Sequence, residues 1–387
     1  MYKTFIYNLK LILIIIFLFR NNFRNNNKYN KIIFKNFLKD CNSLKRYNYI
    51  YINKKSPFIS ICIPVYNMEK NLEKALLSIL NQSFNDIEII IVNDNSKDDT
   101  VKIIQRFQKE FKNIKIIMHL ENRGVYKSRI DAVLNAYGQY ILFMDPDDMF
   151  LNPYLFEELY NYNIKYNLDM IEFSVFHIKE GTKKFYFPEY HELNHYHNFR
   201  KKIICQPELS NILFYKPNTN NYTSLFCRTI WNKLTRKILL INSIKYIEKS
   251  FHNFYLITAD DTPINILNFQ LSNNYSNIKL PGYLYYVREK SSSRLSNDLN
   301  HNVLISYNYL LYFKLFYKYL KDFKKNLNFL FYDLKISFQF LFILKKLKAK
   351  NYLSTSIIFL KEISKNKISI DFKIFIDKII YELEKKI

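Results

Sequence analysis

Residues 140–148 read YILFMDPDD, an apolar run that leads directly into three carboxylates. Tyr140 to Met144 has the length and composition of a buried strand. Neighbouring carboxylates repel one another, so this cluster needs a compensating cation or full contact with water. Mg²⁺ and Mn²⁺ prefer oxygen ligands and take one or two carboxylates, while phosphate and water complete the shell. The alternative is a solvated turn in which one Asp caps the next helix, and the cluster by itself favours that turn.

Around this stretch, short β-branched runs alternate with amphipathic patterns, which is typical of a parallel sheet covered by helices. The pattern predicts strands over residues 58–65, 88–92, 114–118, 140–144, 170–177, 183–187 and 278–288. A first helix has one apolar stripe, formed by Leu72, Ala75, Leu76, Ile79 and Leu80. A capping box at residues 96–99 predicts a second helix to about Phe111, and a third is expected from about Val125 to Tyr137.

From about residue 299 the strand signals fade, and Leu, Phe, Tyr and Lys recur at helical spacing. We therefore expect an α/β domain over residues 57–298, with a mainly parallel central sheet flanked by helices. A helical C-terminal region is expected over residues 299–387.

Polar residues follow four of the predicted strands, and ligands of an open parallel sheet bind beyond the carboxyl ends of its strands. These segments are Pro64-Val65-Tyr66-Asn67, Asn93-Asp94-Asn95-Ser96, Glu121-Asn122-Arg123-Gly124 and Asp145-Pro146-Asp147-Asp148. Asp94 suits a hydrogen bond to a nucleobase, although an isolated Asp more often forms an Asx turn. Arg129 lies on the apolar stripe of its helix and therefore needs an anionic partner, either a carboxylate or a phosphate. Asp260 and Asp261 suit either a helix start or a general base.

The composition excludes several classes of protein. Only four glycines are present, so neither G-x-G-x-x-G nor a Walker loop can be written, and any nucleotide must be bound in another way. The net charge of +24 is spread along the chain, which argues against nucleic acid as a partner. The four cysteines lack the paired spacings of a zinc or redox site, so we expect free core thiols.

The N-terminus carries an apolar run, Leu11 to Phe19, which extends back to Thr4 except for Lys10. As a helix it would be about 24 Å long, short of the roughly 30 Å hydrocarbon core. A signal anchor, a cleaved signal peptide and a helix lying on the membrane are the three possible interpretations. We favour a single membrane anchor over residues 1–20 and a polar stem over residues 21–56. The orientation stays open because positive charge lies on both sides.

Taken together, the order and spacing of the strand-end motifs resemble the family 2 glycosyltransferases of the GT-A fold, over roughly residues 57–294. Three further motifs resemble members that build bacterial surface polysaccharides. They are Trp231-Asn232-Lys233-Leu234, Asp260-Asp261, and Tyr286-Val287-Arg288 with Ser293-Arg294. Asp260 stands where the family usually has Glu, and Ile130 where Asn commonly follows the Arg.

The resemblance implies a nucleotide-sugar donor and a role for each matching residue. The residues expected to bind the donor are Pro64, Tyr66, Asn67, Asp94, Arg129, Asp145, Trp231, Lys233, Arg288 and Arg294. Tyr66 and Asp94 would hold the nucleobase, Arg129 the phosphates and Asp145 the ribose. Trp231 and Lys233 would shape the sugar or acceptor pocket, with a core aromatic as the alternative for Trp231. Arg288 and Arg294 would reach the diphosphate, and a solvated role is the alternative for both.

The resemblance also implies Mn²⁺ or Mg²⁺ on Asp147 and Asp148, and a catalytic base at Asp261 with Asp260 as the alternative. We expect an inverting transfer to a hydroxyl of a glycan, lipid or protein acceptor. Two alternatives stay open: a catalytically silent, membrane-anchored carbohydrate-binding subunit, and a nucleotidyltransferase. Intact carboxylates at every expected position argue against the first alternative.

Overall fold

The computed structural model describes residues 56–179, 185–186, 203–205, 229–250, 261–288 and 370–384, together with positions 317, 357, 360, 361, 364 and 365. Within those ranges, every helix is too short or too polar to cross a bilayer. The predicted anchor and almost all of the predicted stem lie outside them, as do Asp260 and Arg294. In the C-terminal region the structure describes helix α13, Ile370–Glu384.

The first half of the sheet is parallel, as its sequence predicts. It contains β1 (Ile59–Val65), β2 (Ile87–Asn93), β3 (Ile114–Met118) and β4 (Tyr140–Phe143), in the spatial order β3-β2-β1-β4. Every residue of β1 and β4 is buried, which fits their continuous apolar runs and their central positions. The four predicted strands agree with the observed ones to within one residue at either end.

The second half makes the sheet mixed, so the expectation of a mainly parallel sheet is wrong for this part. Here β9 (Lys233–Arg236) runs antiparallel to both β4 and β6 (Met170–Lys179). The long strand β10 (Asn274–Val287) is parallel to β6 but antiparallel to β5 (Met149–Phe150) and β8 (Ile203–Cys205). A last pair joins β6 to β7 (Phe185–Tyr186) in antiparallel fashion. Strand direction depends on the path of the connections, which an apolar run does not encode.

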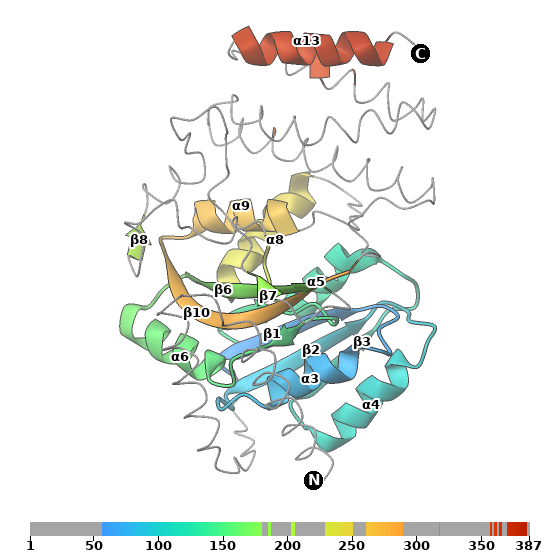
Figure 1. Ribbon diagram of the computed structural model, residues 1–387, viewed down its shortest axis with the longest axis vertical. Coiled ribbons are helices and arrows are strands. Elements are labelled where there is room, and N and C mark those ends of the chain that lie inside the picture. The colour runs from blue at the N-terminus through green and yellow to red at the C-terminus, as the bar shows by residue number, and fades with distance from the viewer. Residues whose placement is uncertain are drawn as a thin grey trace.

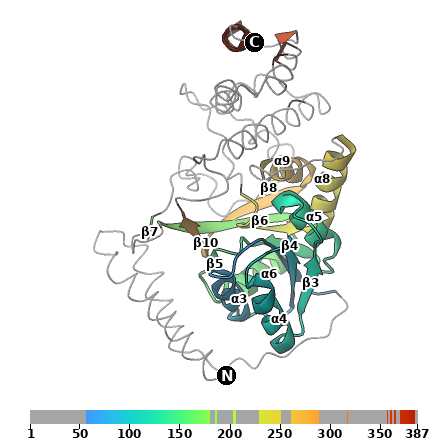
Figure 2. The same cartoon turned by 90° about the vertical axis from the view of Figure 1, so that its right-hand side faces the viewer.

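Helices cover both faces of the sheet. Figures 1 and 2 show α3 (Leu72–Leu80), α4 (Thr100–Glu110) and α6 (Leu155–Tyr166) on one face, and α5 (Gly124–Leu134), α8 (Lys237–Ser250) and α9 (Asp261–Leu271) on the other. The stripe predicted for the first helix is confirmed, because all five of its residues are buried in α3. The predicted capping box does not form: Asp99 is the N-cap of α4 and its side chain makes no capping bond.

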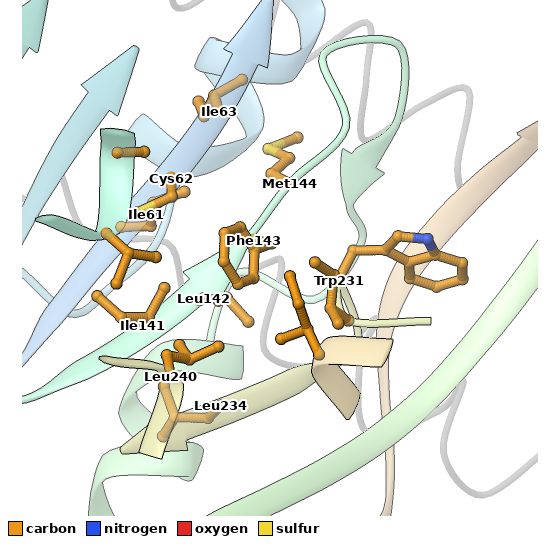
Figure 3. Packing of buried hydrophobic residues seen from close by; sticks show 14 of the residues in the cluster. Ile61, Cys62, Ile63, Ile141, Leu142, Phe143, Met144, Trp231, Leu234 and Leu240 are labelled. Carbon is orange, nitrogen blue, oxygen red and sulfur yellow. The ribbon is translucent and has the colours of Figure 1, made fainter. Parts of the chain in front are cut away.

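The core lies between the sheet and these helices. In Figure 3, apolar side chains of β1 and β4 pack side by side, and Leu234 of β9 extends the same layer. Cys62 is buried there, and burial raises the pKa of its thiol, which keeps it protonated. Cys205 is exposed, so the expectation of a core thiol is wrong at that position. Cys41 and Cys227 lie outside the described residues.

Close approach of backbone at Gly138 sets the start of β4. A Cβ at this position would lie 2.3 Å from Ser60 Oγ and 2.6 Å from the Ser60 nitrogen. Instead, the Gly138 N–H donates to Ser60 Oγ at 2.8 Å and to the Glu88 carboxylate at 3.0 Å. The contact aligns β4 with β1 and β2, and so places the residues that follow β4.

Candidate active site

The loops after β1 and β2 are joined by hydrogen bonds at the carboxyl edge of the sheet. Asn67 adopts a positive φ of 53°, its N–H donates to Ser96 Oγ at 2.9 Å, and its side-chain oxygen accepts the Lys97 N–H at 2.8 Å. Tyr66 precedes Asn67 and is 44% exposed, whereas Pro64 lies within the buried β1 strand. Asn67 therefore stabilises the loop, and Tyr66 is the accessible side chain of the two.

Asp94, which follows β2, holds the N-terminus of α5. Its carboxylate accepts the backbone N–H groups of Arg123 and Gly124, each at 2.8 Å. Gly124 has a φ of 83°, a conformation that L side chains rarely adopt. The arrangement differs from an Asx turn, because the bonded groups lie about thirty residues further along the chain. An acid at a helix N-terminus is favoured by the helix dipole.

Sequence reasoning missed His119, which lies between two carboxylates. Its Nδ1 is 2.7 Å from Asp94 Oδ1 and its Nε2 is 3.0 Å from Asp131 Oδ2. Arg123 also donates to Asp131 at 3.0 Å. The residues next to His119 do not indicate a role for it, since its two partners come from the loop after β2 and from α5. The cluster fixes the orientation of Asp94.

Arg129 joins two parts of the predicted site that are far apart in the sequence. It is only 4% exposed, and its guanidinium donates to Asp145 Oδ1 at 2.8 Å and to Asp261 Oδ1 at 3.3 Å. Asp145 follows β4, and Asp261 is the first residue of α9. The anionic partners of Arg129 in this structure are therefore carboxylates. Burial raises the pKa of Asp145 to about 6, and Asp147 and Asp261 add to this rise, while Arg129 opposes it.

The acidic loop, which we define as Asp145 to Asp148, is a turn in which the Asp148 N–H donates to the Asp145 carbonyl at 3.1 Å. Its carboxylates point to different surroundings. Asp148 is buried and accepts the Tyr286 N–H at 2.9 Å and the Tyr283 hydroxyl at 3.1 Å. Asp147 pairs with the Arg288 guanidinium. The side chains of Asp145 and Asp147 are 24% and 27% exposed, so these two face the solvent side of the loop.

The carboxylates of the acidic loop fit a divalent cation that phosphate oxygens also help to bind. Within the described ranges, no three His, Cys, Asp or Glu side chains converge on one point, so the protein does not supply a complete cage. Mg²⁺ and Mn²⁺ typically need only one or two protein carboxylates beside phosphate and water. Asp145 and Asp147 are two accessible carboxylates separated by one residue. Asp148, in contrast, is directed into the protein and bonds to Tyr283 and Tyr286, so its metal contact stays a prediction.

The structure places Trp231 and Lys233 in the core and not in an open pocket. Trp231 is buried (Figure 3) and stacks on Tyr283 and Tyr285, at centroid distances of 4.6 and 5.4 Å, which matches its alternative as a core aromatic. Lys233 is 0% exposed, and its Nζ lies 3.2 Å from Glu172 Oε2. Lys233 also donates to the Thr229 carbonyl at 2.6 Å. Since neither side chain reaches solvent here, we assign neither a contact with the donor.

The chain is similar to known glycosyltransferases. Residues 60–238 match the family described as "Glycosyl transferase family 2". The uncharacterized glycosyltransferase EpsJ of Bacillus subtilis is 27% identical over 61% of this chain and 62% of its own length. Glycosyltransferase GlyA of Streptococcus pneumoniae is 29% identical over 61% of this chain and 32% of its own length. The chain thus spans less than two thirds of either relative.

The fold is shared with a solved structure. The crystal structure of TarS from S. aureus matches with a TM-score of 0.52 and 17% identity, and the match covers 84% of this chain and 53% of that chain. This likeness and the family match confirm the GT-A fold prediction in its coarser form, a sheet flanked by helices. Residues 60–238, a little under half of the chain, are thus similar to glycosyl transferase family 2.

Proposed function

We propose that the protein is a metal-dependent glycosyltransferase that moves a sugar, with inversion, from a nucleoside diphosphate sugar to a hydroxyl of a glycan, lipid or protein acceptor. The observation that carries this proposal is the Arg129 bridge. One buried guanidinium contacts Asp145, which follows β4, at 2.8 Å and Asp261, at the start of α9, at 3.3 Å. The bridge brings an accessible carboxylate after β4 next to a second carboxylate that could act as a base.

In the proposed mechanism, Asp261 accepts the proton of the acceptor hydroxyl while that oxygen attacks the anomeric carbon. Its side chain is 21% exposed at the start of α9, which supports this role. Arg129 stabilises negative charge on the leaving diphosphate and keeps Asp261 oriented. A bound Mn²⁺ or Mg²⁺ would supply further charge stabilisation at the phosphates, with Asp147 as its protein ligand.

The remaining donor contacts are proposed from the sequence motifs, with side-chain exposure as support. Tyr66 offers its face to a nucleobase at the end of β1. Asp145 accepts from a ribose hydroxyl, and Arg288 contacts the diphosphate. Asp94 supports the site indirectly, since its carboxylate holds the start of α5 through Arg123 and Gly124.

We further propose that residues 1–20 associate the protein with a membrane. Deletion of those residues should then release the protein from the membrane fraction.

A panel of nucleotide sugars tests this function, incubated with Mn²⁺ and without acceptor. Release of a nucleoside diphosphate, lost on adding EDTA, supports the proposal. Release of pyrophosphate would instead identify a nucleotidyltransferase. Donor binding without any turnover, once acceptors have also been supplied, would favour the catalytically silent subunit. Once an acceptor is found, the anomeric configuration of the product by proton NMR checks inversion.

Two substitutions test the assigned roles. Asp261→Asn should abolish transfer and preserve donor binding, because it removes only the base. Asp147→Ala should abolish metal-dependent donor binding. Asp377→Asn, on the exposed side of α13, is the matched control and should behave as the unsubstituted protein. Normal turnover in either of the first two variants would show that the corresponding role is wrong.

A further inference from the structure

The Tyr283 hydroxyl lies between the two ends of the acidic loop. It accepts the backbone N–H of Asp145 at 3.0 Å and donates to Asp148 Oδ2 at 3.1 Å. A phenol can do both at once, because it has one hydrogen and an available lone pair. Tyr283 is completely buried and comes from β10, about 135 residues further along the chain. The catalytic steps proposed above do not use it.

Two aromatic rings pack against Tyr283. Trp231 stacks on it with an interplanar angle of 18°, and Phe150 of β5 meets it edge-on at 5.5 Å. Both neighbours are buried. Because two rings and two strands restrict the phenol, its hydroxyl is a fixed point against which the loop is ordered.

Asp148 is the buried carboxylate of the acidic loop, and Tyr283 bonds to it directly. With Asp148 held inward by Tyr283 and by the Tyr286 N–H, the alternation along the loop leaves Asp145 and Asp147 accessible. We propose that Tyr283 is a positioning residue that orders the acidic loop and thereby presents Asp145 and Asp147 to the metal and the donor. What the loop binds rests on the proposed function, whereas the ordering of the loop by Tyr283 does not.

Tyr283→Phe tests the inference, because it removes the hydroxyl and keeps the ring against Trp231. Tyr285→Phe is the matched control, since Tyr285 lies two residues away on β10 and also stacks on Trp231. The first readout is amide hydrogen exchange of the acidic loop in the protein without ligands. Loss of one buried hydrogen bond should speed exchange at Asp145 about tenfold in Tyr283→Phe, and Tyr285→Phe should leave it unchanged.

Trp231→Phe separates the hydroxyl from the packing around it. It retains the Tyr283 hydroxyl but weakens the stack, so exchange at Asp145 should rise less than in Tyr283→Phe. Equal acceleration in both variants would overturn the inference, because loop order would then come from packing. Unchanged exchange in Tyr283→Phe would overturn it as well.

The second readout is calorimetric titration with Mn²⁺ alone and with Mn²⁺ in the presence of UDP or GDP. We expect about a tenfold weaker Mn²⁺ affinity in Tyr283→Phe, as for other groups that orient metal ligands. Faster exchange with unchanged Mn²⁺ affinity would refute the effect on ligand presentation. If the unsubstituted protein binds neither Mn²⁺ nor nucleotide, the proposed function fails, and the exchange experiment alone decides the role of Tyr283 in ordering the loop.

Discussion

Replacing Lys233 with Met is expected to destabilise the protein and to leave donor affinity nearly unchanged. The substitution keeps an unbranched chain in the core but removes the charge that faces Glu172. Breaking a buried ion pair from one side typically costs about 3–5 kcal/mol, because the remaining charge has no counterion. Glu172 would still accept from the Tyr275 hydroxyl at 3.2 Å and from Asn277 at 3.3 Å. We therefore expect a loss of unfolding free energy at the lower end of this range, about 3 kcal/mol.

Urea unfolding followed by circular dichroism measures this loss, and donor titration measures affinity in the same variant. Lys102→Met on the exposed side of α4 is the control, and its unfolding midpoint should not move. The double variant Lys233→Met with Glu172→Gln should recover part of the stability, because no uncompensated charge remains. An unchanged urea midpoint in Lys233→Met, together with a large loss of donor affinity, would refute the reasoning. Lys233 would then be assigned to the sugar pocket, as the sequence predicts.

Three further predictions concern other parts of the domain. Arg288→Gln should strengthen binding of Mn²⁺ alone about fivefold, because it removes the cation already paired with Asp147, and should weaken UDP binding; calorimetry with each probe checks both signs. Gly124→Ala should cost ~1–2 kcal/mol of unfolding free energy, because its φ is 83°; an unchanged urea midpoint would show that the turn relaxes. Burial lowers the pKa of His177 to about 4, so folding keeps it neutral. Below pH ~6.5 the unfolded chain takes up a proton on His177 and the folded protein does not, so the free energy of unfolding falls, by at most ~3 kcal/mol, as the pH drops towards 4. His177→Gln should flatten this dependence in unfolding experiments at pH 7.5 and 4.5.

The sequence predicts those elements whose signal is local. Strands β1 and β4 are apolar on both faces, and the stripe of α3 follows helical spacing, so burial in the sheet and beneath it can be inferred from neighbouring residues alone. In contrast, β9 has only four residues and begins with Lys233. Its charge is compensated by Glu172, some sixty residues earlier, and no local pattern reveals that partner. The antiparallel direction of β9 likewise leaves no mark in the neighbouring residues, so the sequence did not predict where the parallel part of the sheet ends.

The side chains of the site also divide into those that sequence motifs predict and those that depend on contacts across the fold. The strand-end motifs place Asp94, Asp145 and Asp147 at one edge of the sheet, and the structure agrees with that placement. Their partners could not be inferred, because His119 and Tyr283 carry no motif and act through contacts across the fold. Spacing alone also did not separate Asp148, which is buried, from its accessible neighbour Asp147.

The Arg129 bridge has a consequence for dissecting the protein into fragments. The stretch that matches the family ends at residue 238, yet Asp261, Tyr283 and Arg288 all lie beyond it. A fragment restricted to that stretch would keep Arg129 and the acidic loop but would lack the second carboxylate of the bridge and the hydroxyl that orders the loop. Part of the proposed site is therefore encoded downstream of the stretch that matches the family, and a fragment that retains all of these side chains must extend at least through β10 to Arg288.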